Sequence, residues 1–145
     1  MIKDSYPLLS EPMHRMYMFK SVGTQRVVNK MIVFQKIAGT RYNLSFGDFK
    51  NGRIDDEVIT NNGDLIKVIS TVAQSVYLFF EHYPDASIEI EGVDDRRKRL
   101  YNTILQRRRT EIDAYFEVKG WSDGEFMTLQ EGYFYEKFVI QLKKP

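Results

Sequence analysis

Alternation of apolar and polar residues predicts three β-strands in the first third of the chain. They cover residues 15–21, 26–37 and 41–49. In the third stretch, Tyr42, Leu44 and Phe46 fall on one side, which is the period-2 pattern of a half-buried strand. Because only short turn candidates separate these stretches, we expect an antiparallel meander.

Helical spacing of apolar residues begins after a polar, loop-like segment at residues 50–63. Between residues 64 and 82, apolar side chains recur over a broad arc, which predicts a long helix at the centre of the core. This helix is expected to end before Tyr83-Pro84, because a residue that precedes proline disfavours helical backbone. The residues expected to cap its start are Asn61, Asn62 or Asp64.

Three further strands and one more helix follow in the remaining sequence. The strands are predicted at residues 86–91, 111–119 and 133–142, and the helix at 95–109, capped by Asp94 or Asp95. The resulting order is β-β-β-α-β-α-β-β. We therefore expect an α+β fold in which two helices pack on one face of a mainly antiparallel sheet of about six strands. No linker-like composition divides the chain, so residues 1–145 are predicted to form a single domain.

Composition removes several classes of protein and site. Apolar residues make up 43% and charged residues 28% of the 145 residues, so the chain is not of the disordered class. It contains no cysteine and only two histidines, which argues against disulfides, thiolate metal sites and a His-rich metal site. We expect no cofactor. No signal-peptide-like start and no apolar run of about 20 residues is present, so we expect a cytoplasmic protein with no membrane partner.

The net charge is only +1, so any basic site must be local. The segment 96–109 contains seven basic residues and no acidic one. The arginines at 107–109 would favourably occupy the negative end of the helix dipole, and Asp94 and Asp95 its positive end. The four cations at 96–99 oppose the dipole, at a cost of roughly a few tenths of a kcal/mol each. Their position therefore calls for an explanation.

Arg97 is the most unusual of these residues, because a helical wheel places it on the apolar side together with Leu100, Tyr101 and Ile104. Three interpretations are open. Arg97 pairs with an internal carboxylate, it helps to bind a phosphate, or it belongs to a protein interface. The carboxylates considered for the ion pair are Glu89, Glu91 and Asp48. The candidate anion-binding residues are Arg96, Arg97, Arg99, Tyr101 and Arg108.

Other groups of residues carry weaker indications of chemistry. Glu117-Val118-Lys119 resembles the E-x-K element of metal-dependent nucleases, in which a carboxylate binds Mg²⁺ beside a lysine. The aspartates that could gather around a divalent ion are Asp48, Asp55, Asp56 and Asp64, although turns and caps explain them more simply. On the predicted last strand, Tyr133 and Tyr135 share one side and could stack on bases, with Phe134 opposite, although packing on the sheet surface is the more common role.

The chain resembles a family of small bacterial proteins of unknown function. The resemblance is carried by the blocks Tyr42-Asn43-Leu44-x-Phe46-Gly47-Asp48, Asn61-Asn62-x-Asp64, Thr71-Val72-Ala73, Tyr83-Pro84 and Gly92-x4-Arg97-x-Arg99-Leu100-Tyr101, of which the last is the most specific. Val93-Asp94 stands where small hydroxyl residues are expected, which weakens the idea of a Ser/Thr phosphate loop. The resemblance implies domain limits and no activity.

The sequence therefore favours a non-enzymatic binding or regulatory module that contacts an anionic partner, nucleic acid or phosphate, through the basic helix 95–109. Two alternatives remain open. One is a metal-dependent, nuclease-like enzyme of a toxin or defence system. The other is a protein-interaction subunit that forms a homodimer or binds an anionic protein.

Overall fold

The computed structural model of the chain describes residues 4–23, 26–55 and 63–144, with the backbone alone for 53–55. It contains two compact units. The first is formed by Met1–Gln35 with Ser45–Pro84, and the second by Lys36–Leu44 with Asp85–Pro145. Two long strands contribute residues to both units. A single domain would unfold in one cooperative step, so the prediction that residues 1–145 form one domain stays a prediction.

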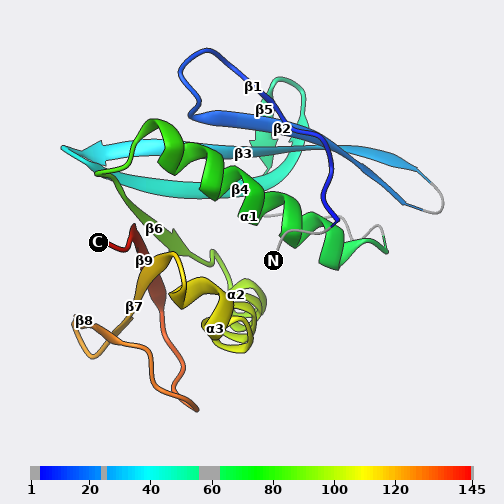
Figure 1. Cartoon of the computed structure of the whole chain (residues 1–145). Coiled ribbons are helices and arrows are strands. Elements are labelled where there is room, and N and C mark those ends of the chain that lie inside the picture. Colours follow the sequence, from blue (N-terminus) through cyan, green and yellow to red (C-terminus); the bar gives the residue numbers. More distant parts are fainter. Residues whose placement is uncertain (1–3, 24–25, 56–62, 145) are drawn as a thin grey trace. The chain divides into compact units, whose positions relative to one another are not determined.

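The fold is α+β with a mixed, mostly antiparallel sheet, as the sequence predicts. In chain order the elements are β1 (Leu9–Ser10), β2 (Met16–Val22), β3 (Val27–Ala38), β4 (Arg41–Lys50), β5 (Arg53–Asp55), α1 (Leu65–His82), β6 (Ser87–Glu91), α2 (Asp95–Arg107), α3 (Arg109–Asp113), β7 (Phe116–Ser122), β8 (Glu125–Thr128) and β9 (Lys137–Leu142) (Figure 1). The strands pair in the order β1-β2-β3-β4-β6-β9-β7-β8, and β5 pairs with β4. The predicted number and order of the strands differ from this arrangement.

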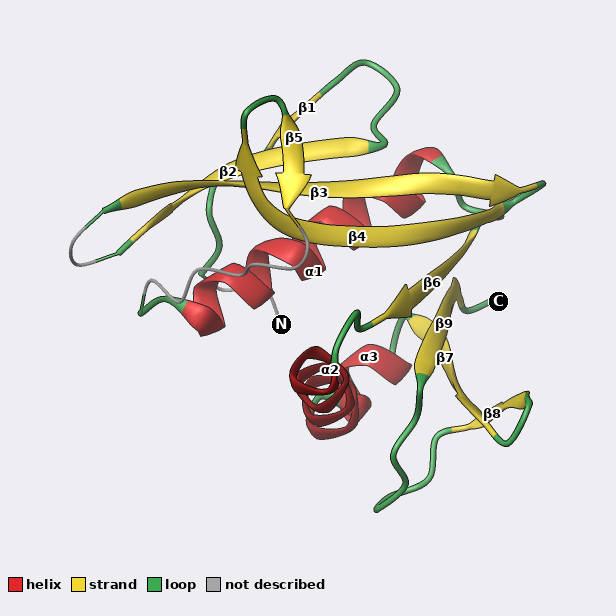
Figure 2. Ribbon diagram, turned by 180° about the vertical axis from the view of Figure 1, so that it is seen from behind, coloured by secondary structure: helices red, strands yellow, loops and turns green. Residues whose placement is uncertain are grey.

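In the first unit, α1 lies along one face of the long strands (Figure 1, Figure 2). Strands β2 and β3 are antiparallel, with Tyr17 opposite Ile32. The side chains of Phe34 and Phe79 stack at 4.3 Å between ring centroids, and both are at most 1% exposed. The broad apolar arc of the sequence therefore faces the sheet, and the bounds of α1 agree with the predicted helix.

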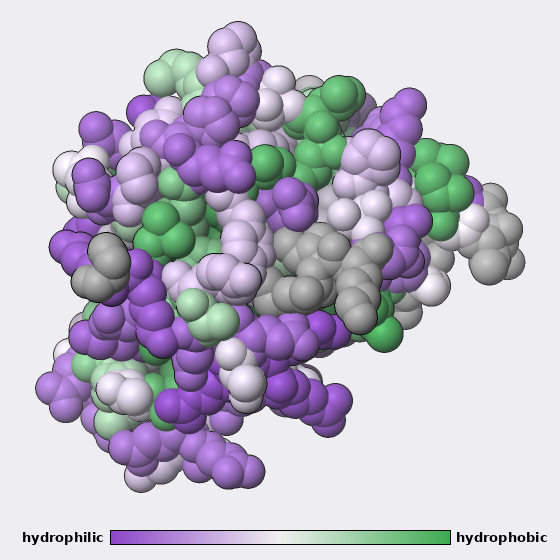
Figure 3. Space-filling model, in the orientation of Figure 1, coloured by the Kyte–Doolittle hydropathy of each residue, from purple (hydrophilic) through white to green (hydrophobic). Residues whose placement is uncertain are grey.

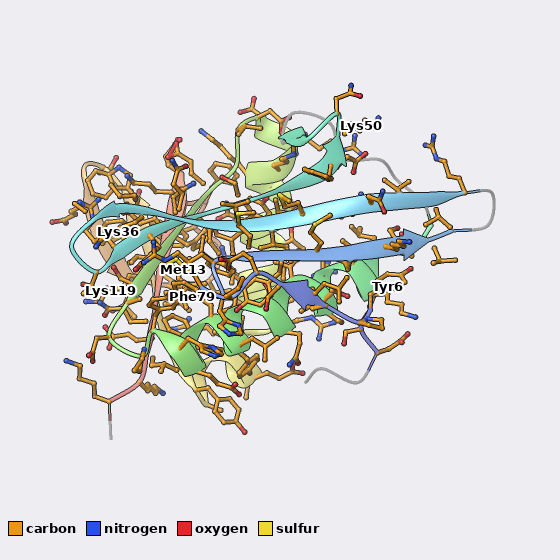
Figure 4. All side chains as sticks on the ribbon, turned by 90° about the horizontal axis from the view of Figure 1, so that it is seen from above. Tyr6, Met13, Lys36, Lys50, Phe79 and Lys119 are labelled. Atoms are coloured by element: carbon orange, nitrogen blue, oxygen red, sulfur yellow. The ribbon has the colours of Figure 1, made fainter. Side chains whose placement is uncertain are left out.

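Hydrogen bonds to Asp64 tie the N-terminal segment to the start of α1. The Asp64 carboxylate accepts bonds from the hydroxyls of Tyr6 and Ser21, while the Tyr6 N–H donates to Thr71 Oγ1 at 2.8 Å. Burial opposes ionisation of Asp64, but these two hydrogen bonds lower its pKa below the usual value. Tyr6 and Phe79 lie near opposite ends of α1 (Figure 4). Asp64 precedes the helix without forming a side-chain cap, and Asn61 and Asn62 lie outside the described residues.

A buried ion pair joins the middle of β3 to β4. Lys30 Nζ donates to Asp48 Oδ1 at 2.6 Å, and the two side chains are 1% and 0% exposed. Asp48 is therefore occupied by an internal partner. Each charge compensates the other in a region that excludes water. Removal of either side chain is therefore expected to lower the free energy of unfolding.

The Tyr17 hydroxyl is buried and has no hydrogen-bond partner among the described residues. Burial raises the pKa of Tyr17 to about 12. An unfolded tyrosine ionises near pH ~10, so the folded state holds this proton more tightly. The stability that Tyr17 contributes is therefore fully present below about pH 10 and is lost as the pH rises from about 10 toward about 12.

We accordingly expect Tyr17→Phe to leave the unfolding free energy unchanged or slightly higher at pH ~7, because the substitution removes an unpaired buried polar group. Above about pH 10 the variant should lose less stability than the wild type, by on the order of 1 kcal/mol per pH unit. Urea unfolding at a series of pH values measures both effects. A loss of more than about 1 kcal/mol at neutral pH would show that the hydroxyl has a partner.

The second unit contains a parallel strand pair, between β4 and β6, with Arg41 opposite Ser87. Strand β9 then lies between β6 and β7, antiparallel to both. The predicted strand at 86–91 is confirmed. The predicted strand at 111–119 is wrong in its first half, because residues Arg109–Asp113 form α3. Ion pairs at helical spacing, from Arg109 to Asp113 and from Arg108 to Glu111, favour this extra turn.

Three short strands, β1, β5 and β8, lie outside the ranges predicted from alternation. The last two follow tight hairpin turns. Asn51-Gly52 joins β4 to β5, and Asp123-Gly124 joins β7 to β8. All four residues have positive φ, from 51° to 83°, as a two-residue type I′ turn requires. Residues 121–124 are therefore the end of β7 and the turn to β8. The predicted last strand, 133–142, begins only at Lys137.

Candidate functional site

Helix α2 begins at a well-formed cap, as the sequence predicts. The Asp94 side chain accepts a hydrogen bond from the Arg97 N–H at 2.8 Å. Gly92 packs directly against this first turn, and a Cβ on it would lie 2.6 Å from the backbone nitrogen of Lys98. Any larger residue at Gly92 would displace the helix start. Since Asp94 already occupies the Arg97 N–H, this backbone donor is not available to a phosphate.

Three of the seven basic residues between 96 and 109 form ion pairs. Lys98 Nζ lies 2.8 Å from Glu136 Oε2, Arg108 lies 3.7 Å from Glu111, and Arg109 lies 3.5 Å from Asp113. The hydrogen bond to Glu136 raises the pKa of Lys98 above its usual value. These three cations are explained by local structure, although Arg108 is among the predicted anion-binding residues.

Three other arginines lie on one exposed side of α2. Arg96, Arg99 and Arg107 are separated by three and eight residues, which places them on one side of a helix. All three are exposed, and none forms an ion pair with a carboxylate in the described part of the chain. We call these residues the arginine stripe. Strongly hydrophilic residues gather over the region where α2 lies in the same view (Figure 3, Figure 1).

Arg97 is buried, with only 6% of its surface exposed. Its Nη1 atom has no hydrogen-bond partner, and no ion pair involves its guanidinium within residues 4–23, 26–55 and 63–144. Arg97 pairs with none of the three carboxylates predicted as its partners. Glu89 lies 2.8 Å from Arg41 and 3.7 Å from Lys137. Asp48 pairs with Lys30, and Arg97 forms no ion pair with Glu91. Arg97 is thus a buried cation without a carboxylate partner in the described part of the chain, which is an unfavourable arrangement.

On the adjoining side, α2 binds the backbone of the segment that precedes β9. The Asn102 amide donates to Tyr135 O and accepts from Tyr135 N–H, both at 2.8 Å. Gln106 donates to Tyr133 O at 2.8 Å, and Lys98 holds Glu136. The three helix residues are spaced by four, so they lie in one row. We call Lys98, Asn102 and Gln106 the clasp.

The clasp explains why residues 133–136 are not part of β9. Tyr135 is completely buried, whereas Tyr133 and Phe134 are 51% and 48% exposed. The rings of Tyr133 and Tyr135 stack on each other, which agrees with their predicted common side. Because Tyr135 is buried, the less common role, base stacking by both tyrosines, is wrong, and Phe134 is exposed as well. Tyr101, another predicted site residue, is half-buried.

The other groups with predicted chemistry have local or internal partners, where their side chains are described. Glu117 and Lys119 are both exposed on β7 and lie 3.5 Å from each other. Of the four aspartates considered for a metal, Asp48 and Asp64 have internal partners, and the side chains of Asp55 and Asp56 are outside the described residues. Among the residues described, no group of three or more His, Asp or Glu side chains is arranged to hold a metal ion.

None of the helices described is both long and apolar enough to cross a membrane.

Comparison with known proteins gives a family and nothing more. Residues 2–143 match a family described as "Family of unknown function (DUF6934)". No curated protein and no solved structure matches the chain. The match covers nearly the whole chain, which agrees with the resemblance to a family of unknown function seen in the sequence.

Proposed function

The chain belongs to the DUF6934 family, whose function is unknown, and we propose that this member is a non-enzymatic module that binds the phosphate backbone of nucleic acid through helix α2. The observation that carries the proposal is the arginine stripe. Its three guanidinium groups are exposed and form no ion pair in the described structure, while Lys98, Arg108 and Arg109 each have a carboxylate.

The dimensions of the stripe suit a polyanion better than a single small anion. From Arg96 to Arg107 the helix rises about 16 Å, at about 1.5 Å per residue. A nucleic-acid strand presents several phosphates over that length, and guanidinium groups bind phosphate through parallel hydrogen bonds. No acidic residue interrupts residues 96–109, so the whole face favours negative charge.

Arg97 supports this function from beneath the stripe. A charge in a poorly solvated position is screened less than one in water, so its field reaches further. Arg97 therefore strengthens the positive potential at the first turn of α2, where Arg96 and Arg99 are exposed. A bound phosphate would in turn offset the cost of leaving Arg97 uncompensated. The N-cap Asp94 limits contact at the helix end itself, so the proposed contact runs along the stripe.

We expect Arg96→Gln/Arg99→Gln/Arg107→Gln to weaken binding of a labelled oligonucleotide about tenfold or more at about 50 mM salt. The slope of log affinity against log salt should also decrease by about one for each arginine that no longer binds a phosphate. Fluorescence anisotropy titrations over a range of salt concentrations measure both quantities. The physical reason is that each arginine on a phosphate releases bound counterions.

The matched control is Lys20→Gln/Lys36→Gln/Lys50→Gln, which removes the same charge from exposed strand residues. Lys36 and Lys50 are labelled in Figure 4. This control should retain affinity and salt slope. Arg97→Met should weaken binding several-fold while the unfolding free energy stays equal or increases, because the variant removes an uncompensated buried charge. Equal losses in the stripe variant and the lysine variant would refute the proposal.

The sequence motif that carries the family resemblance is also a proposal. We propose that Gly92-x4-Arg97-x-Arg99-Leu100-Tyr101 is a signature of the family, and the close approach of Gly92 to the first turn of α2 supports this. An alignment of family members tests it directly. A bacterial source and a cytoplasmic location likewise stay predictions from the sequence.

A further inference from the structure

Two adjacent aromatic rings are exposed beside helix α2. Tyr133 and Phe134 are 51% and 48% exposed, although rings of this size are usually mostly buried. The Tyr133 ring stacks on the buried ring of Tyr135, with 6.3 Å between centroids and 23° between planes. One ring of the exposed pair is thus held in a fixed orientation by a fully buried neighbour.

The clasp holds these aromatic residues against a particular side of α2. Gln106 binds the carbonyl of Tyr133, and Asn102 binds both backbone groups of Tyr135. Arg107 directly follows Gln106, and a step of one residue is a rotation of about 100° around a helix. Arg99 follows Lys98 in the same way. The backbone that carries the aromatic pair is therefore bound to a strip of α2 that lies about 100° around the helix axis from Arg99 and Arg107.

Exposed arginines together with exposed aromatic rings are typical of one class of binding surface. Positive groups that follow a backbone, next to aromatic rings on which bases stack, form the usual surface for single-stranded nucleic acid. In a duplex the bases are stacked inside and their faces cannot reach a protein ring. Contacts to phosphate alone would not discriminate between the two forms.

We propose that the partner of this surface is single-stranded nucleic acid, with phosphates on the arginine stripe and bases stacked on Tyr133 and Phe134. This inference rests on the proposed function and adds the class of ligand. Stacking depends little on base identity, so the recognition is tolerant of sequence. The stripe contributes affinity for any nucleic acid, and the rings contribute the preference for unpaired strands.

The test compares labelled oligo-dT, oligo-U and a DNA duplex, each of about 12 residues or base pairs, by fluorescence anisotropy. The wild type should bind the single strands about tenfold or more tightly than the duplex, and the two single strands show whether DNA or RNA is preferred. Tyr133→Ala/Phe134→Ala should lose about tenfold or more in affinity for single strands and keep its affinity for the duplex. Tyr133→Phe/Phe134→Tyr preserves both rings and should retain binding.

Tyr115→Ala is the matched control, because Tyr115 is 58% exposed and lies outside the clasp. Its binding should be unchanged. Unaltered single-strand affinity in the double alanine variant, with a wild-type circular dichroism spectrum, overturns this inference alone, because duplex binding that depends on the stripe would still support the proposed function. No binding of any oligonucleotide by the wild type overturns both. Equally tight binding of polyglutamate would overturn the nucleic-acid assignment in favour of an acidic protein.

Discussion

Lys30→Met is expected to lower the unfolding free energy by about 3–5 kcal/mol, because it leaves the buried carboxylate of Asp48 without its cation. Both side chains are at most 1% exposed, so water cannot replace the missing partner. A domain has only about 5–15 kcal/mol of stability in total. The variant should therefore unfold at a much lower urea concentration than the wild type.

The double variant Lys30→Met/Asp48→Val keeps this prediction testable even if the single variant does not fold. Replacing a whole buried ion pair by apolar residues is often neutral or stabilising, so the double variant should recover most of the stability. A double variant as unstable as Lys30→Met would show that the pair does more than compensate its own charges. Urea unfolding, followed by circular dichroism, gives the free energies.

The same experiment tests whether the chain is a single cooperative domain. Trp121 is the only tryptophan, and it lies in the second unit, whereas Lys30 and Asp48 lie in the first. In a two-state protein, fluorescence of Trp121 and circular dichroism must show coincident transitions. If Lys30→Met shifts the circular dichroism transition and leaves the fluorescence transition in place, the two units unfold separately.

Asn102→Ala is expected to lower the unfolding free energy by about 2–6 kcal/mol, since it leaves the N–H and the carbonyl of the fully buried Tyr135 without partners. Each unpaired buried backbone group costs about 1–3 kcal/mol. The expected result is a lower urea midpoint, together with faster hydrogen exchange of the Tyr135 amide. Thr103→Ala, at the exposed position next to Asn102, should change the free energy by less than about 0.5 kcal/mol.

This prediction also separates the role of the clasp from that of the rings that it holds. Gln106→Ala removes the bond to Tyr133 O at a more exposed site, so we expect a smaller decrease in stability, of about 1 kcal/mol. If Asn102→Ala costs no more than Gln106→Ala, the segment 133–136 is not held by buried hydrogen bonds, and the fixed position of the aromatic pair would need another explanation.

Some differences between the predicted and the observed fold arise from signals that are present in the sequence. Asn51-Gly52 and Asp123-Gly124 are dipeptides that favour two-residue hairpin turns, and each precedes a short strand that alternation alone does not predict. The strands β5 and β8 have only three and four residues, too few to show alternation clearly. The turn chemistry is therefore the more informative signal at both places.

Other features depend on interactions between distant residues. Residues 133–135 alternate like a strand, yet Asn102 and Gln106 take their backbone hydrogen bonds, so β9 begins later. A backbone group can have only a limited number of partners, and a side chain 33 residues away decides which partner is chosen. The ion pair between Lys30 and Asp48 likewise depends on the pairing of β3 with β4.

By itself the sequence determined the α+β class, the helix with its broad apolar arc, the Asp94 cap and the dense positive charge of α2. These features depend on periodicity and on residues within a few positions of one another, which the local physics of helices and strands controls. Only the tertiary structure decided which of the described arginines are paired, that Arg97 is buried with no carboxylate partner among the described residues, and that Tyr133 and Phe134 are exposed in the segment that the clasp binds. The reason is that burial and partners depend on residues brought together by folding, and the order of residues along the chain does not specify them.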